Sequence, residues 1–415
     1  MARTSNLSDG SCCHCHSCRH VTGALRSSDA IWPGPAEDIA RAAAASPDPS
    51  GSGGKPPLKR FRCSPKTNLL FCAGCGCVLF FEEFDEPREE IKGGEIPEGA
   101  SYLVFTGALS AEAADEGGEV PRPLVRVVDH IFVGDTLDGG AVPWLRHLNG
   151  EGGEEVKVWL GRRGESEEVP SGAHWPALAD LPKYEAGLKK AEGDKGNVPV
   201  RCKCGGVDLV LRAGELQREF EEKQKKGEEL WWLVDPVTHK LMGSMDACES
   251  CRRCAGSEVC NWTFALLRHI SFADGNPDGF PKDTAELRAA VEAKDGKPRD
   301  PRLGTLTMYA SSPDVQRYFC GRCSAHVFFA VDSRPEMVDI AVGLLDAPDG
   351  ARAESVISWN FGGGMSWTQD MKGTWREGIL DAVSKDAEEW RIARGYPKNW
   401  RRVIREQEGQ PGKNL

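Results

Sequence analysis

The sequence has no apolar run long enough to cross a bilayer. Its most apolar window, LLFCAGCGCVLFF, is short and rich in glycine, whereas a transmembrane helix needs about 20 apolar residues. The opening residues, MARTSNLSDGSC, also lack the basic region and apolar stretch of a secretory signal. We therefore expect a protein without a membrane partner, in the cytoplasm or the nucleus.

The sequence also has no excess of positive charge. Lys and Arg number 52 against 63 Asp and Glu, so the net charge is −11. Surfaces that bind nucleic acid are usually basic, and this balance argues against a nucleic-acid partner. No GxxxxGK loop between a strand and a helix is present either, so the glycine-rich GGGMSW predicts a turn and not a phosphate site.

Cysteine, in contrast, is abundant, with 16 residues in the chain. In a secreted protein such a number would indicate disulfides. Thiols stay free in a reducing compartment, where clustered cysteines usually bind a metal or carry out thiol chemistry. We therefore read the cysteines as metal ligands.

Blocks of the sequence recur in the same order along the 415 residues. FCAGCGCVLFF begins at Phe71, and the similar FCGRCSAHVFF begins at Phe319. CHSCRHVTG begins at Cys15, and CESCRRCAG begins at Cys248. A third block, VVDHIFVGDTLDGG from Val127, resembles MVDIAVGLLDAPDG from Met337. The chain is predicted to contain two copies of one domain.

The repeat sets the expected domain organisation. We expect a first domain at 1–145, incomplete at its N-terminal side, a linker at 146–197, a second domain at 198–395 and a tail at 396–415. Short runs such as LTMYASS and HVFFAVD are typical of strands. The stretch GTWREGILDAVSKDAEEWRIARG has apolar residues at helical spacing. The predicted fold class is all-β, two tandem domains with a C-terminal helix.

One set of cysteines has the spacing of a closed zinc site. Two short Cys pairs that lie far apart in sequence, each in a tight turn, are the usual source of four tetrahedral thiolate ligands. The alternatives are four separate buried thiols or a redox CxxC, but the βαβ setting of a thioredoxin-like motif is absent. The predicted ligands of this structural zinc are Cys202, Cys204, Cys320 and Cys323.

A second set, Cys13, Cys15 and Cys18, offers three thiolates in a short stretch of chain. Three protein ligands with an open position are typical of a reactive zinc. A thiol that bound at the open position would be held as thiolate, because the cation favours the deprotonated form. The alternative is a closed site, in which Cys12 or one of the nearby histidines supplies the fourth ligand.

These motifs together resemble one known family. CxC, then CxCxxCR with a following glycine, then SPxxxRxFCxxC and an apolar strand is similar to the glutathione-dependent formaldehyde-activating enzyme and centromere protein V family. RCKCGG, CESCRRCAG and SSPDVQRYFCGRC carry the resemblance in the second copy, and CHCHSCRHVTGA and FCAGCGCVLFF carry it in the first. Together the copies cover most of the chain outside the linker.

The resemblance implies a zinc-bearing β-tent fold and zinc as the cofactor. It implies a structural zinc on the CxC and CxxC pairs and a second zinc on the CxCxxC trio. The activity it implies is a carbon–sulfur lyase acting on adducts of glutathione, or a similar small thiol, with formaldehyde. Cys13, Cys15 and Cys18 would then be the catalytic residues, and Arg19, at the family's usual position, would help to hold a glutathione carboxylate.

The first copy departs from the family pattern at its structural zinc. Cys72 and Cys75 match the CxxC pair, but no CxC pair precedes the trio. Cys63 and Cys77 could take its place, or the first copy could lack this zinc.

The second copy departs from the pattern at its trio. Asp246 stands at the first position, whereas Cys248 and Cys251 remain as expected ligands. Asp246 could itself bind the metal, or Cys254 could complete the set. These departures favour an alternative function, a non-catalytic binding or scaffold module that zinc stabilises. The sequence leaves the oligomeric state open.

Overall fold

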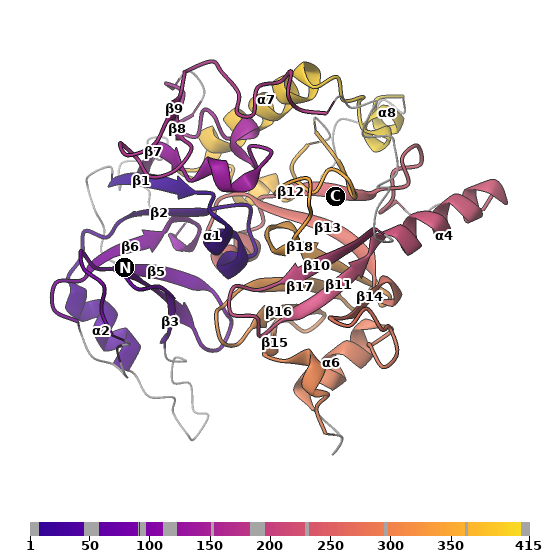
Figure 1. Cartoon of the computed structure of the whole chain (residues 1–415), viewed down its shortest axis with the longest axis horizontal. Helices are drawn as coiled ribbons and strands as arrows, with labels where there is room; N and C mark the ends of the chain where they lie inside the picture. The colour runs from indigo at the N-terminus through magenta and orange to yellow at the C-terminus, as the bar shows by residue number, and fades with distance from the viewer. Residues whose placement is uncertain are drawn as a thin grey trace.

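Strands make up most of the regular structure, and several helices accompany them (Figure 1). The structure is a computed structural model, and it describes residues 8–44, 58–89, 91, 97–110, 123–150, 153–182, 196–228, 232–293, 298–361 and 364–407. The strands of these residues form three sheets. The prediction of an all-β fold is therefore right about the predominance of strands and wrong about the helices, which are not confined to the C-terminal region.

The first large sheet has nine strands in the described part of the chain, in the order β3-β4-β5-β6-β2-β1-β7-β8-β9. All neighbours are antiparallel except β1 with β7 and β7 with β8, which are parallel. The strands are β1 (Ser8–Cys13), β2 (Ser27–Ile31), β3 (Leu58–Ser64), β4 (Thr67–Cys72), β5 (Val78–Glu83), β6 (Ser101–Phe105), β7 (Val125–Ile131), β8 (Lys157–Trp159) and β9 (Glu168–Val169).

The second large sheet has the order β15-β16-β17-β18-β13-β12-β19. Its pairs are antiparallel except β12 with β19, which is parallel. The strands are β12 (Leu241–Asp246), β13 (Cys260–Leu266), β15 (Leu306–Ser312), β16 (Val315–Cys320), β17 (His326–Val331), β18 (Met337–Ala341) and β19 (Ile357–Trp359).

The two large sheets repeat the same order over seven strands. Even their irregularities match, because β3–β4 shifts register between Arg62 and Ser64, and β15–β16 shifts at the aligned positions of the repeat, between Ala310 and Ser312. A slip of one residue would turn every side chain to the opposite face of a sheet. The matching bulges therefore show that the repeated sequence blocks occupy equivalent places in the two sheets.

One of the proposed sequence matches is wrong. Val127 lies in β7, the parallel neighbour of β1, whereas Met337 begins β18, which lies between β17 and β13. The strand equivalent to β18 is β6, and the strand equivalent to β7 is β19. Both blocks are apolar strands that end in a glycine-containing turn. Their short sequence similarity therefore matched two strands that lie at different positions in the two sheets.

The segment predicted as a linker contributes to the first sheet. Strands β8 and β9 extend it beyond β7, and residues 151–152 and 183–195 of this segment lie outside the described residues. The chain then enters a small third sheet of β10 (Asn197–Arg201), β11 (Asp208–Arg212) and β14 (Ile270–Phe272).

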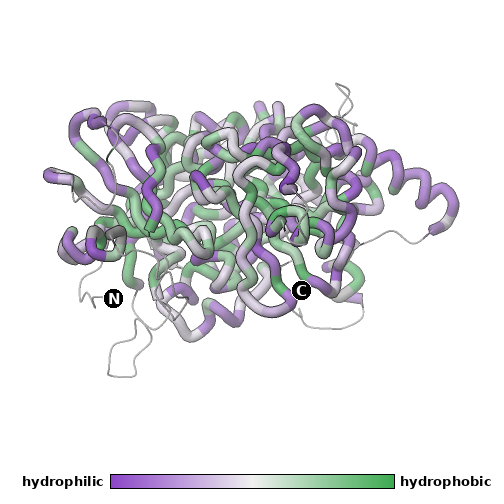
Figure 2. The backbone as a smooth tube through the Cα atoms, turned by 90° about the horizontal axis from the view of Figure 1, so that it is seen from below, coloured by the Kyte–Doolittle hydropathy of each residue, from purple (hydrophilic) through white to green (hydrophobic). Residues whose placement is uncertain are grey.

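The helices lie around and between the sheets. The helix α4 projects from the body of the molecule and is mostly hydrophilic (Figure 2). None of the described helices combines the length and the apolar character that a bilayer crossing requires. The helices are α1 (His16–Thr22), α2 (Ala36–Ala44), α4 (Ala213–Lys225), α5 (Glu249–Ala255), α6 (Thr284–Glu292), α7 (Glu377–Ala393) and α8 (Trp400–Gln407).

Each copy packs the helix of its cysteine motif against the other copy. In the first copy α1 packs against the 3₁₀ turn η7 (Val342–Leu344) of the second, and α5 packs against η1 (Thr106–Ala108) of the first. The backbone contacts are reciprocal: Gly107 N donates to Gly256 O at 3.1 Å, and Gly343 N donates to Gly23 O at 2.9 Å. The copies therefore meet through the same surface on each side, as the subunits of a twofold dimer do.

This reciprocal packing gives the molecule one continuous hydrophobic core. Val21 and Phe105 of the first copy belong to the same cluster of buried apolar residues as Ala255 and Ala341 of the second. The apolar stretches, green in Figure 2, accordingly run through both halves. Each copy buries apolar surface against the other, and that burial stabilises the pair.

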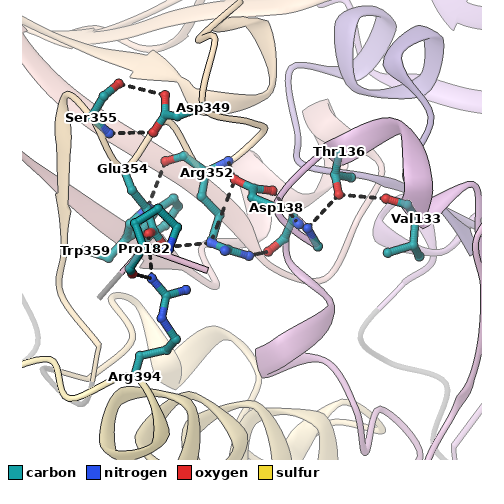
Figure 3. A network of polar contacts seen from close by, with 12 residues as sticks. Val133, Thr136, Asp138, Pro182, Asp349, Arg352, Glu354, Ser355, Trp359 and Arg394 are labelled. Atoms are coloured by element: carbon teal, nitrogen blue, oxygen red, sulfur yellow. Dashed lines mark hydrogen bonds and ion pairs between the residues drawn. The ribbon is translucent and has the colours of Figure 1, made fainter. Parts of the chain in front are cut away.

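A buried polar network also joins the copies (Figure 3). Arg352 is fully buried; its backbone N donates to Asp138 Oδ2 at 2.7 Å, and its side chain donates to Gly140 O at 3.0 Å and to Glu354 Oε1 at 2.8 Å. Arg394 donates to Glu354 Oε2 at 3.2 Å. A buried cation without partners would be costly, so these partners fix the turn around Asp138 against the second copy.

Candidate metal centres

The sulfur atoms of Cys202, Cys204, Cys320 and Cys323 all lie within 4.8 Å of one another. The Cys204 sulfur is 3.6 Å from that of Cys202 and 3.5 Å from that of Cys320. Zinc–sulfur bonds of about 2.3 Å in a tetrahedron place sulfurs roughly 3.8 Å apart. Four thiols at this spacing fit a structural zinc ion.

The fold brings these four cysteines together from three strands. Cys202 and Cys204 follow β10, whereas Cys320 ends β16 and Cys323 lies in the turn before β17. Backbone groups hold the sulfurs in place, because Val207 N donates to Cys202 Sγ at 3.2 Å and Cys323 N donates to Cys320 Sγ at 3.4 Å. Such donors to sulfur stabilise thiolates and orient metal ligands.

The four thiols differ in pKa because they lie close enough to hydrogen-bond to one another. The hydrogen bond from Cys202 lowers the pKa of Cys204 to about 7. The pKa of Cys323 is raised well above its usual range, because its thiol donates its proton to the neighbouring sulfurs. A bound cation would remove the need for the thiols to share protons, since it favours the thiolate form of every ligand.

The second predicted group, Cys13, Cys15 and Cys18, also converges, with all three sulfurs within 4.8 Å of one another. Cys13 ends β1, and Cys15 is the N-cap of α1, where its sulfur accepts from Cys18 N at 3.3 Å. Hydrogen bonds from the Cys13 and Cys18 thiols lower the pKa of Cys15 to about 3. The Cys15 sulfur is therefore the hydrogen-bond acceptor within the trio.

The neighbours considered as a fourth ligand turn away from the trio. Cys12 is buried and donates to Ser28 Oγ at 3.8 Å. His14 Nε2 is 3.0 Å from His130 Nδ1 on the far side of the strand. The other two histidines of the motif turn to an aspartate of the second copy, described below. None of these residues closes the group of three.

Two cations lie beside the trio. Arg19 is 5% exposed, and its Nε has no hydrogen-bond partner. Burial lowers the pKa of Arg19, and the charge of the nearby Cys15 opposes that shift. Lys203, from the CxC turn of the second copy, donates from Nζ to Ser17 Oγ at 2.6 Å. The trio therefore lies at the contact between the copies, with positive charge from both.

A third group consists of Asp246, Cys248 and Cys251, again with ligand atoms within 4.8 Å. Burial raises the pKa of Asp246 to about 7, and the hydrogen bond from Cys251 lowers the pKa of Cys248 to about 6. Arg317 Nη1 donates to Cys251 Sγ at 3.4 Å, so a cation already neutralises part of the charge of this group. Cys254 does not belong to it, and of the two predicted alternatives the aspartate is the one in place.

Cys72 and Cys75 occupy the same hairpin position in the first sheet as Cys320 and Cys323 in the second. Cys72 N donates to Cys77 O at 2.9 Å, and the equivalent bond joins Cys320 to Ala325 at 2.9 Å. Of the predicted substitutes, Cys77 is a neighbour, 3.3 Å from Cys75 between sulfurs. Cys63 instead donates to Phe61 O at 3.9 Å and interacts with Cys15 and Lys203.

Sequence reasoning missed one further group of metal-binding side chains, His16, His20 and Asp346. The two imidazoles stack at 3.9 Å between ring centroids, and their Nε2 atoms lie 3.3 and 3.2 Å from Asp346 Oδ1. One helical turn separates the histidines, a spacing that would have placed them on one helix face. Asp346 belongs to the second copy, and no spacing rule connects a residue so distant in sequence to His20.

The comparisons with known proteins add no further assignment to this geometry. We compared the chain with models of protein families, with curated proteins and with solved structures, and none of the three comparisons finds a match.

Proposed function

We propose that this zinc-binding protein is a carbon–sulfur lyase that acts on adducts of glutathione, or a similar small thiol, with an aldehyde such as formaldehyde. The observation that carries the proposal is the trio of Cys13, Cys15 and Cys18, from which Cys12 and the three histidines of the motif turn away. Three protein ligands leave one position for a thiol from solution.

The chemistry requires no oxidant. A zinc ion on the trio would lower the pKa of an incoming thiol and hold it as thiolate. In the synthetic direction the thiol sulfur bonds to the aldehyde carbon, and the thiol proton passes to the carbonyl oxygen. In the lyase direction the carbon–sulfur bond breaks and the proton returns to sulfur, so atoms and electrons balance either way.

The residues around the trio would bind and orient the thiol. Arg19 can pair with a carboxylate of glutathione through its guanidinium, because its Nε is without a partner and Arg binds carboxylates in a bidentate fork. Lys203 holds the loop through Ser17 and adds positive charge. Both cations favour a bound anion at this position.

The experiment is a titration of the cobalt-substituted protein with glutathione. We expect the cobalt–thiolate absorption to change at saturating thiol in the wild type and in Cys248→Ser, and to stay unchanged in Cys15→Ser. Cys248 is the matched control because it occupies the equivalent position in the other copy. Arg19→Gln should raise the half-saturating glutathione concentration roughly tenfold, the effect of losing a charged hydrogen bond.

A second candidate function is a non-catalytic module in which zinc only stabilises the scaffold. The continuous core and the cysteine groups at the contact between copies favour it, because metal ions at such places would lock the copies together without chemistry. A wild-type cobalt spectrum that does not respond to glutathione, together with no turnover of formaldehyde, would replace the lyase proposal with this one.

A further inference from the structure

We propose that Cys72, Cys75, Cys77 and Cys254 form a zinc site that links the two copies. The first three cysteines belong to the hairpin between β4 and β5, and Cys254 belongs to α5 of the second copy. This site requires that cysteine clusters bind metal, but it does not depend on the lyase activity.

The contact between the copies brings these sulfurs together. Cys77 lies 3.3 Å from Cys75 and 3.6 Å from Cys254 between sulfur atoms, although Cys77 and Cys254 belong to different copies. Cys72 in turn makes a side-chain hydrogen bond with Cys75. The four thiols thus form a continuous chain of contacts, and the separations of Cys77 from its two neighbours are close to the roughly 3.8 Å between the sulfurs of a tetrahedral zinc site. The chain is more open than the quartet at Cys202, whose sulfurs all lie within 4.8 Å of one another, so rotation of the outer cysteine side chains would have to close the set around an ion.

A fifth residue lies near all four thiols. Tyr309 interacts electrostatically with each of Cys72, Cys75, Cys77 and Cys254. Four thiols in one neighbourhood supply the kind of donor atoms that zinc prefers.

The two linking cysteines have no counterpart in the other half of the repeat. When the two hairpin blocks are aligned, Cys77 corresponds to Ala325. When the two blocks that carry α1 and α5 are aligned, Cys254 corresponds to Val21. Each of these cysteines stands where the opposite half carries an apolar residue, and the two cysteines meet. A metal site accounts for both exchanges together, whereas packing alone would be satisfied by alanine and valine.

A buried histidine points to the same place. His326 is 1% exposed and interacts with Cys254 both through a side-chain hydrogen bond and through its charge. Its charge also acts on Cys75. A metal-bound thiolate at Cys254 would accept the N–H group of this imidazole, which would hold the ligand in place.

The fold makes the two hairpins equivalent but gives them different partners. The hairpin at Cys320 meets the CxC turn after β10, and the hairpin at Cys72 meets α5. The quartet ties the three-stranded sheet of the second copy to the large sheet of the same copy. The proposed site would instead tie the second copy's helix to the first copy's sheet, so it would strengthen the contact between copies.

The test is the zinc content of the full chain by native mass spectrometry. Cys77→Ala and Cys254→Val introduce the residues that the other half carries, and each should contain one zinc ion fewer than the wild type. The double variant should also lose one ion and not two. Cys12→Ala, which removes a buried cysteine outside the cluster, should lose none. Unchanged zinc content in Cys77→Ala and Cys254→Val would overturn the proposal.

A measurement on the wild type covers the case in which a variant does not fold. Alkylation by N-ethylmaleimide, read by peptide mass spectrometry, should spare Cys77 and Cys254 in the zinc-loaded protein and label both once a chelator removes one ion. Equal labelling with and without chelator, or a disulfide between these two cysteines in the isolated protein, would overturn the site. In the glutathione titration, the comparison with Cys15→Ser isolates the response of the Cys13 trio, so the two proposals can fail separately.

Discussion

At the scale of single residues, the cysteines differ in what surrounds them more than in their spacing. Cys15 and Cys248 occupy equivalent positions, yet Cys15 has two thiol neighbours and Cys248 has one thiol and one carboxyl. Arg317 lies against Cys251, whereas Leu69 takes the equivalent position in the first copy. The cysteine motif therefore has a different charge environment in the two copies. In the first copy no arginine takes this position, so a bound metal cation would neutralise more of the charge there.

Loss of one quartet ligand should be severe. We expect Cys323→Ser to release one zinc ion per chain and to lower the free energy of unfolding by more than about 4 kcal/mol, as loss of a metal site does. The measurements are zinc content and urea denaturation. Cys12→Ser is the control, because it changes a buried cysteine that belongs to none of the groups, and it should keep all of its zinc. If Cys323→Ser keeps its full zinc content, Cys323 is not a ligand.

A buried carboxyl should make stability depend on pH. Burial, with a smaller contribution from the charge of Glu83, raises the pKa of Asp29 from 3.8 to about 8. Above pH 3.8 the unfolded chain releases this proton while the folded protein keeps it, so the free energy of unfolding falls as the pH rises toward about 8. Asp29→Asn should remove this part of the decline.

The comparison is between denaturation curves taken from about pH 5 to about pH 8, the window that the raised pKa sets. Asp9→Asn changes an exposed carboxylate on the strand next to that of Asp29, and it should keep the wild-type dependence. A variant at Asp29 that follows the wild-type curve would show that the buried carboxyl is ionised in the folded protein.

At the scale of elements, strands were predictable where their pattern is local. LTMYASS and HVFFAVD form β15 and β17, and the C-terminal apolar pattern forms α7. Helices α1 and α5 were not predicted, because each is short and lies within a cysteine motif. Helices of that length are marginal alone, and here packing against the other copy stabilises them. The helix α4 has buried Leu216 and Phe220 one helical turn apart, a signal that sequence reasoning overlooked.

The reciprocal contact of these helices leaves no room for a side chain at Gly107. A Cβ there would lie 2.4 Å from Arg252 O and 2.4 Å from Ser257 N. We expect Gly107→Ala to lower the free energy of unfolding by about 1–3 kcal/mol, the usual cost of overpacking, as measured by urea denaturation.

Gly378 provides the control for this prediction. It lies in α7, where an added Cβ would meet only Gly150 Cα at 3.4 Å, and Gly378→Ala should stabilise the protein by up to about 1 kcal/mol through helix propensity. If Gly107→Ala is as stable as the wild type, the two copies do not contact each other through this turn.

At the scale of the whole molecule, two similar sheets behave as one folded unit. A single cluster of buried apolar residues spans both copies, and the network of Arg352 and Asp138 crosses the same contact. The predicted domain boundaries stay predictions, but the shared core means that neither copy buries its apolar surface alone.

Metal removal should therefore destabilise both copies together. In differential scanning calorimetry we expect one unfolding transition for the zinc-loaded chain, and one transition at lower temperature after chelation, because a shared core couples the sheets. Two resolved transitions in the zinc-loaded chain would contradict this coupling. A transition that does not move after complete zinc release would show that the cysteine groups contribute nothing to stability.

Features that depend on spacing between near neighbours could be predicted from the sequence. The trio at Cys13, the short pairs at Cys202 and Cys320, the repeated hairpins and the C-terminal helix all follow from local patterns, since the turn or strand that carries a pattern needs few distant contacts. The meeting of the two distant pairs followed from the four ligands that a structural zinc requires. Tertiary structure alone decided which groups from different copies meet. Cys254 lies beside Cys77 and not with Cys248, and Asp346 lies beside His20, because the reciprocal packing of the helices and the shared core bring these residues together. Contacts between residues so far apart in sequence depend on how apolar surfaces pack, and no local pattern specifies that packing.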